Sequence, residues 1–203
     1  MTSPYTLDDF DYALPPELIA QQPAAQRSAS KLLDARGATP RDRVFHELPA
    51  LLRAGDLLVF NDTRVIKARL LGVKSSGGAV EALVERVLPQ HEVLAQLRAS
   101  KAPRAGSMLR FEGAFDAEVL GRAPEAMLYR LRLPDDPLSL LERHGRVPLP
   151  PYIGHAAGTD DESRYQTVFA KRPGAVAAPT AALHFDGPLL RALAEQDVAT
   201  AYV

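Results

Sequence analysis

The sequence predicts an α/β main domain that is interrupted by an inserted all-β module of antiparallel strands. The first observation is a series of six short strand-like runs, mostly between residues 67 and 134, with hairpin-length gaps between them. The second is that helical and strand-like patterns alternate on both sides of this region. We therefore expect residues 1–66 and 135–203 to form the main domain, and residues 67–134 to form a barrel or a sandwich.

The elements before residue 67 are short. Prolines followed by good helix formers predict a helix over 14–21. The apolar run 57–60, which ends at Asn61 and Asp62, is the best candidate for a buried strand in this half. Turn residues separate the remaining elements, which are a strand at 31–34, a partner strand at 43–46 and a helix at 48–53.

The inserted module alternates strand-like runs with turns rich in glycine, serine and proline. The run 127–133 has the alternation of apolar and polar side chains that a half-buried strand requires. The sequence Ser75-Ser76-Gly77-Gly78 is typical of a hairpin turn. The six predicted strands are 65–74, 80–87, 91–100, 108–112, 117–120 and 127–133.

Helical patterns return after residue 135. Residues 137–145 have proline near the start and glycine at the end, and residues 187–196 have leucines at the spacing of an amphipathic helix. Three prolines predict an extended segment over 147–151, the polar residues 154–162 predict a loop, and 198–203 is strand-like. A final helix and strand are half of an α/β unit, so we expect the chain to be the N-terminal part of a longer protein.

Composition excludes several classes of protein. Of the 203 residues 46% are hydrophobic and 24% are charged, which is typical of a packed protein and not of a disordered chain. Neither an apolar run of about eighteen residues nor a secretory signal is present, so we expect a cytoplasmic protein without a membrane partner. With no cysteine and no histidines at metal-ligand spacing, we expect no bound metal.

Two stretches of the chain carry cations without acids, although the formal net charge is only −1. One lies between Asp62 and Glu81 and the other extends over 98–110. Such runs could contact phosphates. A solvated strand face is the simpler interpretation on charge alone.

Three clusters of residues have side chains suited to chemistry, and each also has a purely structural interpretation. Residues 60–69 place polar groups after a strand, where ligand contacts or an ordinary turn are both common. Residues 149–169 include tyrosines that could stack a base, or they form a stiff connection. Residues 174–185 combine small residues with His184. A lone histidine in such a place is more often a core residue than a catalyst, although its imidazole would titrate in a useful range if it reached a substrate. The usual glycine-rich nucleotide loops and the G-x-S-x-G elbow are absent.

Four motifs follow one another along the chain: F-N-D-T-R-V-I at 60–66, P-L-P-P-Y-I at 148–153, R-Y-Q-T-V-F-A at 164–170 and G-A-V-A-A-P-T at 174–180. The opening D-F-D-Y-A-L-P at 9–15 precedes them. Together they resemble the S-adenosylmethionine:tRNA ribosyltransferase-isomerase family of queuosine biosynthesis. The resemblance extends over the whole chain, and it implies a barrel-like α/β main domain, incomplete here, with an inserted antiparallel barrel.

The resemblance also implies a reaction. The ribosyl part of S-adenosylmethionine would be transferred to 7-aminomethyl-7-deazaguanine at the wobble position of tRNA and rearranged to epoxyqueuosine, with release of adenine and methionine. S-adenosylmethionine and tRNA would be the partners, the enzyme would be a monomer, and no metal would be required. A base must reach the C5′ protons that the sulfonium acidifies. The alternative is a non-catalytic RNA-binding or structural fragment of that enzyme.

Residue roles follow from the resemblance. The expected catalytic residues are Asp62 or His184 as the base and Thr180 for orientation, with Asn61 also orienting the substrate. Arg64 and Arg69 would pair with a phosphate or with the methionine carboxylate. The remaining substrate-binding residues would be Tyr165, which could stack a base, and Thr63, Gln166 and Pro179. The expected tRNA-binding residues are the module's cations Arg98, Lys101, Arg104 and Arg110.

The sequence departs from the family pattern at a few positions. Ala182 stands where the family has glycine, and it would cost about 1 kcal/mol if that position needs a positive φ. Ser28 replaces an acid, Lys31 replaces an arginine and Lys67 replaces a proline.

Overall fold

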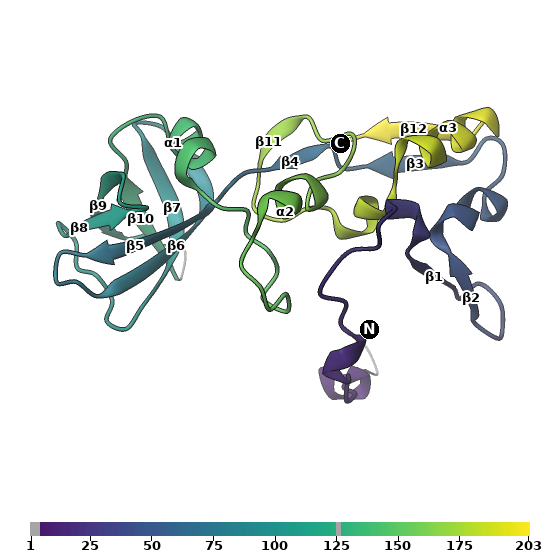
Figure 1. Cartoon of the computed structure of the whole chain (residues 1–203), viewed down its shortest axis with the longest axis horizontal. Coiled ribbons are helices and arrows are strands. Elements are labelled where there is room, and N and C mark those ends of the chain that lie inside the picture. Colours follow the sequence, from purple (N-terminus) through teal and green to yellow (C-terminus); the bar gives the residue numbers. More distant parts are fainter. Residues whose placement is uncertain (1–4, 125–126) are drawn as a thin grey trace.

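The computed structural model describes residues 5–124 and 127–203. A closed β-barrel lies at one end of an elongated molecule, and short helices and two-stranded sheets lie at the other (Figure 1). We call this second part the body. The α/β part with an inserted all-β barrel is confirmed. No helix in the described ranges is long and apolar enough to cross a membrane.

The barrel has six antiparallel strands in the order β10-β7-β6-β5-β8-β9. Because β10 pairs with both β7 and β9, the sheet closes on itself, and the sandwich interpretation is excluded. Closure removes the free sheet edges that would otherwise expose unpaired backbone groups. The strands are β5 (Arg69–Lys74), β6 (Ala79–Leu88), β7 (Glu92–Ala99), β8 (Met108–Phe111), β9 (Phe115–Arg122) and β10 (Leu128–Arg132).

The barrel encloses one continuous hydrophobic core. Alternate residues of its strands point inward, as Val80, Ala82 and Val84 do along β6. The core continues into helix α1 (Pro137–His144), whose Leu140 and Leu141 are buried in it. The predicted helix over 137–145 is confirmed, and it packs on the barrel.

Within the described residues, the body contains three two-stranded sheets (Figure 1). The first is the predicted antiparallel hairpin, although its second strand lies at 41–44 and not at 43–46, because a 3-10 helix begins at Phe45. The other two are parallel pairs between distant segments. The strands are β1 (Lys31–Asp34) with β2 (Arg41–Val44), β3 (Leu57–Phe60) with β12 (Ala199–Tyr202), and β4 (Thr63–Val65) with β11 (Arg172–Ala175). The helices that the structure describes in the body are α2 (Thr159–Arg164) and α3 (Gly187–Glu195), with the 3-10 helices η1 (Leu7–Phe10), η2 (Pro16–Leu18), η3 (Arg27–Ala29), η4 (Phe45–Leu51) and η5 (Thr180–His184).

A second, smaller core fills the body, and aromatic rings form its centre. The ring of Phe60 lies 4.7 Å from that of Phe169 and 4.9 Å from that of Phe185, measured between centroids. The predicted amphipathic helix is confirmed as α3, which contributes the buried Leu189 and Leu193. Ala182 of η5 is buried in this core, which fixes the position of that helix and so of the side chains that it carries.

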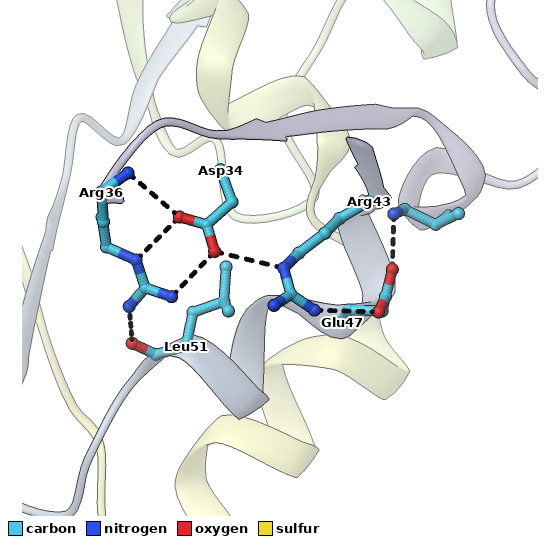
Figure 2. A network of polar contacts seen from close by, with 6 residues as sticks. Asp34, Arg36, Arg43, Glu47 and Leu51 are labelled. Atoms are coloured by element: carbon cyan, nitrogen blue, oxygen red, sulfur yellow. Dashed lines mark hydrogen bonds and ion pairs between the residues drawn. The ribbon is translucent and has the colours of Figure 1, made fainter. Parts of the chain in front are cut away.

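An ion-pair network connects the β1–β2 hairpin to η4 (Figure 2). The Asp34 carboxylate accepts hydrogen bonds from Arg36 Nε at 2.9 Å and from Arg43 Nε at 3.2 Å. Arg36 also donates to the Leu51 carbonyl at 2.9 Å, and Arg43 pairs with Glu47 at 3.3 Å. The Arg36 hydrogen bond holds the pKa of Asp34 well below its usual range. The network therefore closes the hairpin against the helix that follows it.

Several sequence predictions are wrong in detail. The expected helix over 14–21 is only the 3-10 turn η2, which buries no side chain and so lacks the tertiary packing that a short helix needs. The expected strand over 65–74 is broken into β4 and β5, because residues 66–68 turn inward and bury Ile66 and Ala68. Leu57 and Val59 of β3 are 57% and 59% exposed whereas Phe60 is buried, so that strand is buried on one face only.

The polar segment 154–162 is not a simple loop, because α2 begins within it. The backbone N–H of Gly158 donates to the Asp161 carboxylate at 2.8 Å, and three acids occupy the first helical turn. Acids at that end complement the helix dipole. The composition that predicts a loop is therefore also the composition of a helix N-terminus.

Candidate functional site

A pocket of about 690 Å³ opens in the body, between the N-terminal segment, the proline-rich segment around residue 150, α2 and η5. Three of the predicted site residues line it: Tyr165, Thr180 and His184. The structure thus brings together the second and third sequence clusters. The lining also includes Tyr152, the second tyrosine of the predicted stacking platform, and Arg27 and Ser30, which had no predicted role.

His155 and His184 both line this pocket, and His184 is the one that the sequence predicts as a candidate base. Its Nδ1 lies 2.7 Å from the Ser30 hydroxyl oxygen, and its ring lies 5.2 Å from that of Phe45. Burial lowers the pKa of His184, and the nearby charge of Arg27 lowers it further. The imidazole is therefore neutral at neutral pH and can accept a proton.

Arg27 connects three elements beneath the pocket. Its guanidinium donates to the backbone carbonyls of Leu183 at 3.0 Å, Ser163 at 2.8 Å and Arg164 at 3.3 Å. These carbonyls belong to η5 and α2, whereas Arg27 itself begins η3. The arginine therefore fixes η3, η5 and α2 relative to one another on this side of the pocket.

The N-terminal segment closes one side of the pocket through polar contacts with residues 152–164. The Gln21 side chain donates to the Tyr152 carbonyl at 3.0 Å and accepts from the Gly154 N–H at 2.7 Å. Arg164 donates to the Ala24 carbonyl at 2.6 Å. The segment is held by polar side-chain contacts and not by strand pairing. Hydrophobic periodicity in the sequence therefore could not predict its position beside the pocket.

Tyr165 offers a flat surface at the end of α2. Its side chain is half-buried, and burial raises the pKa of its hydroxyl. Tyr152, which is 54% exposed, lines the same pocket. The two rings are suited to an aromatic ligand such as a base. Thr180 is exposed at the start of η5 and presents a hydroxyl on the same lining.

Asp62 lies outside this pocket. It is buried, and its carboxylate accepts a hydrogen bond from Arg172 Nε at 2.8 Å. Its backbone carbonyl accepts from the N–H of Lys171 at 2.8 Å. These contacts connect the turn after β3 to the start of β11, and Arg172 is a partner that no sequence signal indicated.

The other residues of the first cluster also form backbone-supporting contacts. The Asn61 side chain accepts from the Thr63 N–H at 2.9 Å, as the turn interpretation predicts. The Gln166 amide accepts from the N–H of Val65 at 3.0 Å and donates to its carbonyl at 3.2 Å. Neither Asn61 nor Gln166 lines the pocket, and the half-buried Pro179 immediately precedes η5.

Arg64 and Arg69 lie away from the pocket as well. Arg64 lines a different cleft of about 610 Å³, together with Lys67 and α1. Arg69 pairs with Glu81 at 3.5 Å and donates to the Leu149 carbonyl at 3.3 Å. Lys67, which stands where the family has proline, pairs with Glu162 of α2 at 3.0 Å.

The four barrel cations are exposed. Lys101 and Arg104 lie in the connection between β7 and β8, and the carbonyl of Lys101 accepts from Lys74 Nζ at 3.1 Å. Arg98 lies on β7, whereas Arg110 pairs with Asp116 at 3.1 Å. Arg110 is thus already paired with an acid, and of the four predicted tRNA-binding cations Arg98, Lys101 and Arg104 are better able to bind an external anion.

Ala182 causes no backbone strain. It lies inside η5 and does not have a positive φ. It is buried in the core of the body, with Phe45 and Phe185. The expected cost of replacing glycine is therefore not incurred here.

The comparisons agree on one family. The family model described as "Queuosine biosynthesis protein" matches residues 7–203. A relative from Aromatoleum aromaticum is 60% identical over 200 residues, and one from an Azoarcus species is 58% identical over 200 residues. Both are named "S-adenosylmethionine:tRNA ribosyltransferase-isomerase", and each match covers 98% of this chain and 57% of the relative. The chain thus spans a little over half of their length.

A solved structure is also similar in sequence. It is an S-adenosylmethionine tRNA ribosyltransferase from Thermotoga maritima, with 28% identity and a TM-score of 0.38. The match covers 96% of this chain and 57% of that one.

Proposed function

The chain belongs to the queuosine biosynthesis protein family, and from that premise we propose that it carries part of the active site of a tRNA ribosyltransferase-isomerase. The observation that carries the proposal is the identity of about 60% to named relatives along 98% of the chain. The substrates would be S-adenosylmethionine, as ribosyl donor, and tRNA carrying 7-aminomethyl-7-deazaguanine. The products would be epoxyqueuosine-tRNA, adenine and methionine.

We place the donor in the pocket lined by Tyr165, Thr180 and His184. The tyrosine ring is suited to stack on adenine, and the threonine hydroxyl can orient the ribose. His184 is neutral because burial lowers its pKa, so it can take a proton from the C5′ carbon beside the sulfonium. Asp62 is the weaker candidate for the base, because Arg172 already pairs with its carboxylate.

Two further events of the reaction need groups from the protein or the tRNA. Adenine leaves readily only when one of its nitrogens is protonated or hydrogen-bonded, and the proton taken by His184 is one source for that step. The attacking amine of the tRNA base must be neutral, which a partly buried pocket favours by penalising the ammonium form. No step of this scheme requires a metal.

We propose that the barrel contacts the tRNA backbone through Arg98, Lys101 and Arg104. All three are exposed, and phosphate contacts from such residues release counterions. Changing Lys101 and Arg104 to glutamate should weaken tRNA binding and reduce the slope of log K against log salt by roughly 1 to 2. Arg110, paired with Asp116, should matter less. An unchanged slope would remove the barrel from the interface.

Adenine release in the presence of the aminomethyl-deazaguanine tRNA tests the proposal directly. His184→Gln should lower the rate by roughly 10²- to 10⁴-fold, the usual contribution of a general base. Asp62→Asn should lower it less, and its loss should parallel a loss of stability. The assay should compare this chain with a version extended to the full length of its relatives.

The outcomes of that comparison separate the two candidate functions. Release by either version supports the ribosyltransferase. tRNA binding without adenine release in both versions would favour the non-catalytic RNA-binding fragment.

A tRNA-modifying enzyme acts where tRNA is made and used, so we also place the protein in the cytoplasm. We propose that it is a monomer there, and light scattering after gel filtration tests this.

A further inference from the structure

The Ser30 hydroxyl lies between two hydrogen-bond partners at the edge of the pocket. Its oxygen is 2.7 Å from His184 Nδ1 and 3.1 Å from the carbonyl oxygen of Arg27. Ser30 and His184 are both half-buried, and both line the pocket. Among residues 5–124 and 127–203, His184 Nε2 has no hydrogen-bond partner.

A hydroxyl has only one proton, and this decides how the three groups share their hydrogen bonds. A carbonyl oxygen can only accept, so the contact with Arg27 requires the Ser30 proton. The Ser30 oxygen must then accept its other hydrogen bond from His184, which places the imidazole proton on Nδ1. Nε2 of the neutral ring is left with its lone pair.

The position of Ser30 is fixed by the same frame that builds the pocket. The guanidinium of Arg27 donates to the Leu183 carbonyl at 3.0 Å, immediately before His184. The Ser30 carbonyl accepts from the N–H of Phe45 at 2.8 Å, and the ring of Phe45 packs on the imidazole. Arg27 and Phe45 thus fix the backbone of both residues next to each other, although Ser30 and His184 are 154 positions apart in the sequence.

We infer that Ser30 is a positioning residue that holds His184 in the Nδ1-protonated tautomer and presents Nε2 to the pocket as the proton acceptor. The nitrogen that carries the proton of a neutral histidine is set by the hydrogen bond that the other nitrogen makes. A free imidazole has its proton mainly on Nε2, so the serine reverses the intrinsic preference. The catalytic use of Nε2 rests on the proposed function, whereas the tautomer does not.

Long-range ¹H–¹⁵N spectra of the full chain test the tautomer without any substrate. The signal of His184 is identified by its loss in His184→Gln, and the spectra are recorded above the pKa of the ring. The wild-type protein should show the proton on Nδ1. Ser30→Ala should move most of the population to the Nε2-protonated form, and Ser30→Thr, which keeps a hydroxyl, should restore the wild-type signal.

Ser28→Ala provides a matched control from the same segment. Its hydroxyl donates to Asp186 at 2.6 Å and not to His184, so the tautomer should be unchanged. A wild-type spectrum with the proton on Nε2 would overturn the inference. An identical tautomer in wild type and folded Ser30→Ala would do the same. The wild-type spectrum alone decides the first point even where Ser30→Ala fails to fold.

Adenine release then tests whether the tautomer serves the reaction. In a serine protease, a wrong histidine tautomer lowers kcat by about 10⁴-fold, and since Ser30→Ala leaves both tautomers accessible we expect a loss of roughly 10- to 100-fold. The loss should appear in kcat with KM little changed, and Ser30→Thr should recover most of it. A rate that falls in His184→Gln but not in Ser30→Ala overturns the inference. A rate unaffected by either change overturns instead the base assigned in the proposed function.

Discussion

The barrel and the body are built on different principles. The barrel closes a single antiparallel sheet around one continuous core, and its neighbouring strands are mostly neighbours in the sequence. In the part of the chain that the structure describes, the body has three separate two-stranded sheets, two of which join distant segments, and only β1–β2 and β3–β12 contribute side chains to its smaller aromatic core. The barrel therefore pairs its own backbone around its own core. Leu57 and Val59 of the body are 57% and 59% exposed, more than Leu71 and Val73 of the barrel at 37% and 45%, and it is the body that holds the pocket described above.

The contrast suggests a division of roles. We propose that residues 67–134 form a domain of their own, with α1 as its cover, since Leu140 and Leu141 belong to the barrel core. A closed barrel is a rigid platform for contacts with a large partner. A pocket assembled from loops and 3-10 helices is better able to adjust around a small substrate.

The largest effect should come from Phe111, which is fully buried in the barrel. Phe111→Ala should lower the free energy of unfolding by about 3–5 kcal/mol through lost transfer energy and the cavity left behind. Urea denaturation, monitored through the NMR signals of the barrel and of the body, measures this free energy. If the barrel is an independent unit, the signals of the body should persist after those of the barrel are lost.

Leu193→Ala is the matched change in the body, since Leu193 is equally buried. It should cost about 2–5 kcal/mol and unfold the body first. Simultaneous loss of both regions in both variants would show that the two parts fold as one unit.

Gly145 lies at the junction of the two regions, and its substitution should have the next largest effect. A Cβ at this position would overlap the carbonyl oxygen of Lys67 and lie 2.6 Å from that of Leu141. Gly145→Ala forces apart α1 and the segment that enters the barrel, at a cost of about 1–3 kcal/mol. Thermal unfolding measures the loss.

Gly37→Ala is its control, because the nearest atom to a Cβ there is the Thr39 carbonyl oxygen at 3.7 Å. That distance is an ordinary van der Waals contact, so Gly37→Ala should be neutral or slightly stabilising, by at most about 1 kcal/mol. Equal losses in the two variants would mean that the junction is not tightly packed.

Aspartates cap one helix in each region, and they allow a direct comparison. Asp186 accepts from the Leu189 N–H at 3.0 Å and from the Ser28 hydroxyl at 2.6 Å, whereas Asp136 caps α1 through the Ser139 N–H at 2.9 Å. Asp186→Ala should cost about 1–2 kcal/mol, because it removes a cap and the connection to η3. Asp136→Ala should cost less. Chemical denaturation of both variants measures the difference.

The same two caps predict how stability depends on pH. Burial alone would raise the pKa of Asp186, but the hydrogen bonds from Ser28 and Leu189 more than offset it and lower the pKa. The Ser139 N–H lowers the pKa of Asp136. For both groups, the stabilisation is fully present above the unfolded pKa and is lost as the pH falls through the lower folded pKa. The acid-induced loss should be smaller in each alanine variant, and an unchanged acid profile would contradict the assigned role of the caps.

The sequence predicts the barrel far better than the body, and the reason is the range of the contacts. Barrel strands follow one another through turns such as Ser75-Ser76-Gly77-Gly78, so local alternation and turn residues specify most of the pairing. β11 was not predicted, because Arg-Pro-Gly-Ala has no strand propensity and its extended form depends on pairing with β4. β3 was predicted as a strand, but its burial could not be inferred from an apolar run alone.

The site shows the same limit. The motifs identified Thr180, Tyr165 and His184, which do meet in one pocket. Asp62 has the residue type of a base, but its partner Arg172 is 110 positions away and no local pattern indicates the pairing. Ser30 lies in the segment where Ser28 and Lys31 depart from the family motif. Its role depends on a contact across 154 positions, which only the fold reveals.

The smallest effect should come from Val59 in the body, and it sharpens the comparison most. Val59 is 59% exposed on β3, whereas Val119 is fully buried in the barrel. Val→Thr exchanges a methyl for a hydroxyl of similar size. At position 59 the hydroxyl meets solvent, so the free energy of unfolding should change by less than about 0.5 kcal/mol. At position 119 the hydroxyl is buried and should cost about 1–3 kcal/mol.

Urea midpoints of both variants, measured at two protein concentrations, test these expected changes. A loss at position 59 as large as that at 119 would contradict an open face on β3, and its dependence on concentration would show that a second copy covers that face. A small change at position 59 that is equal at both concentrations would mean that this face of β3 remains exposed in solution.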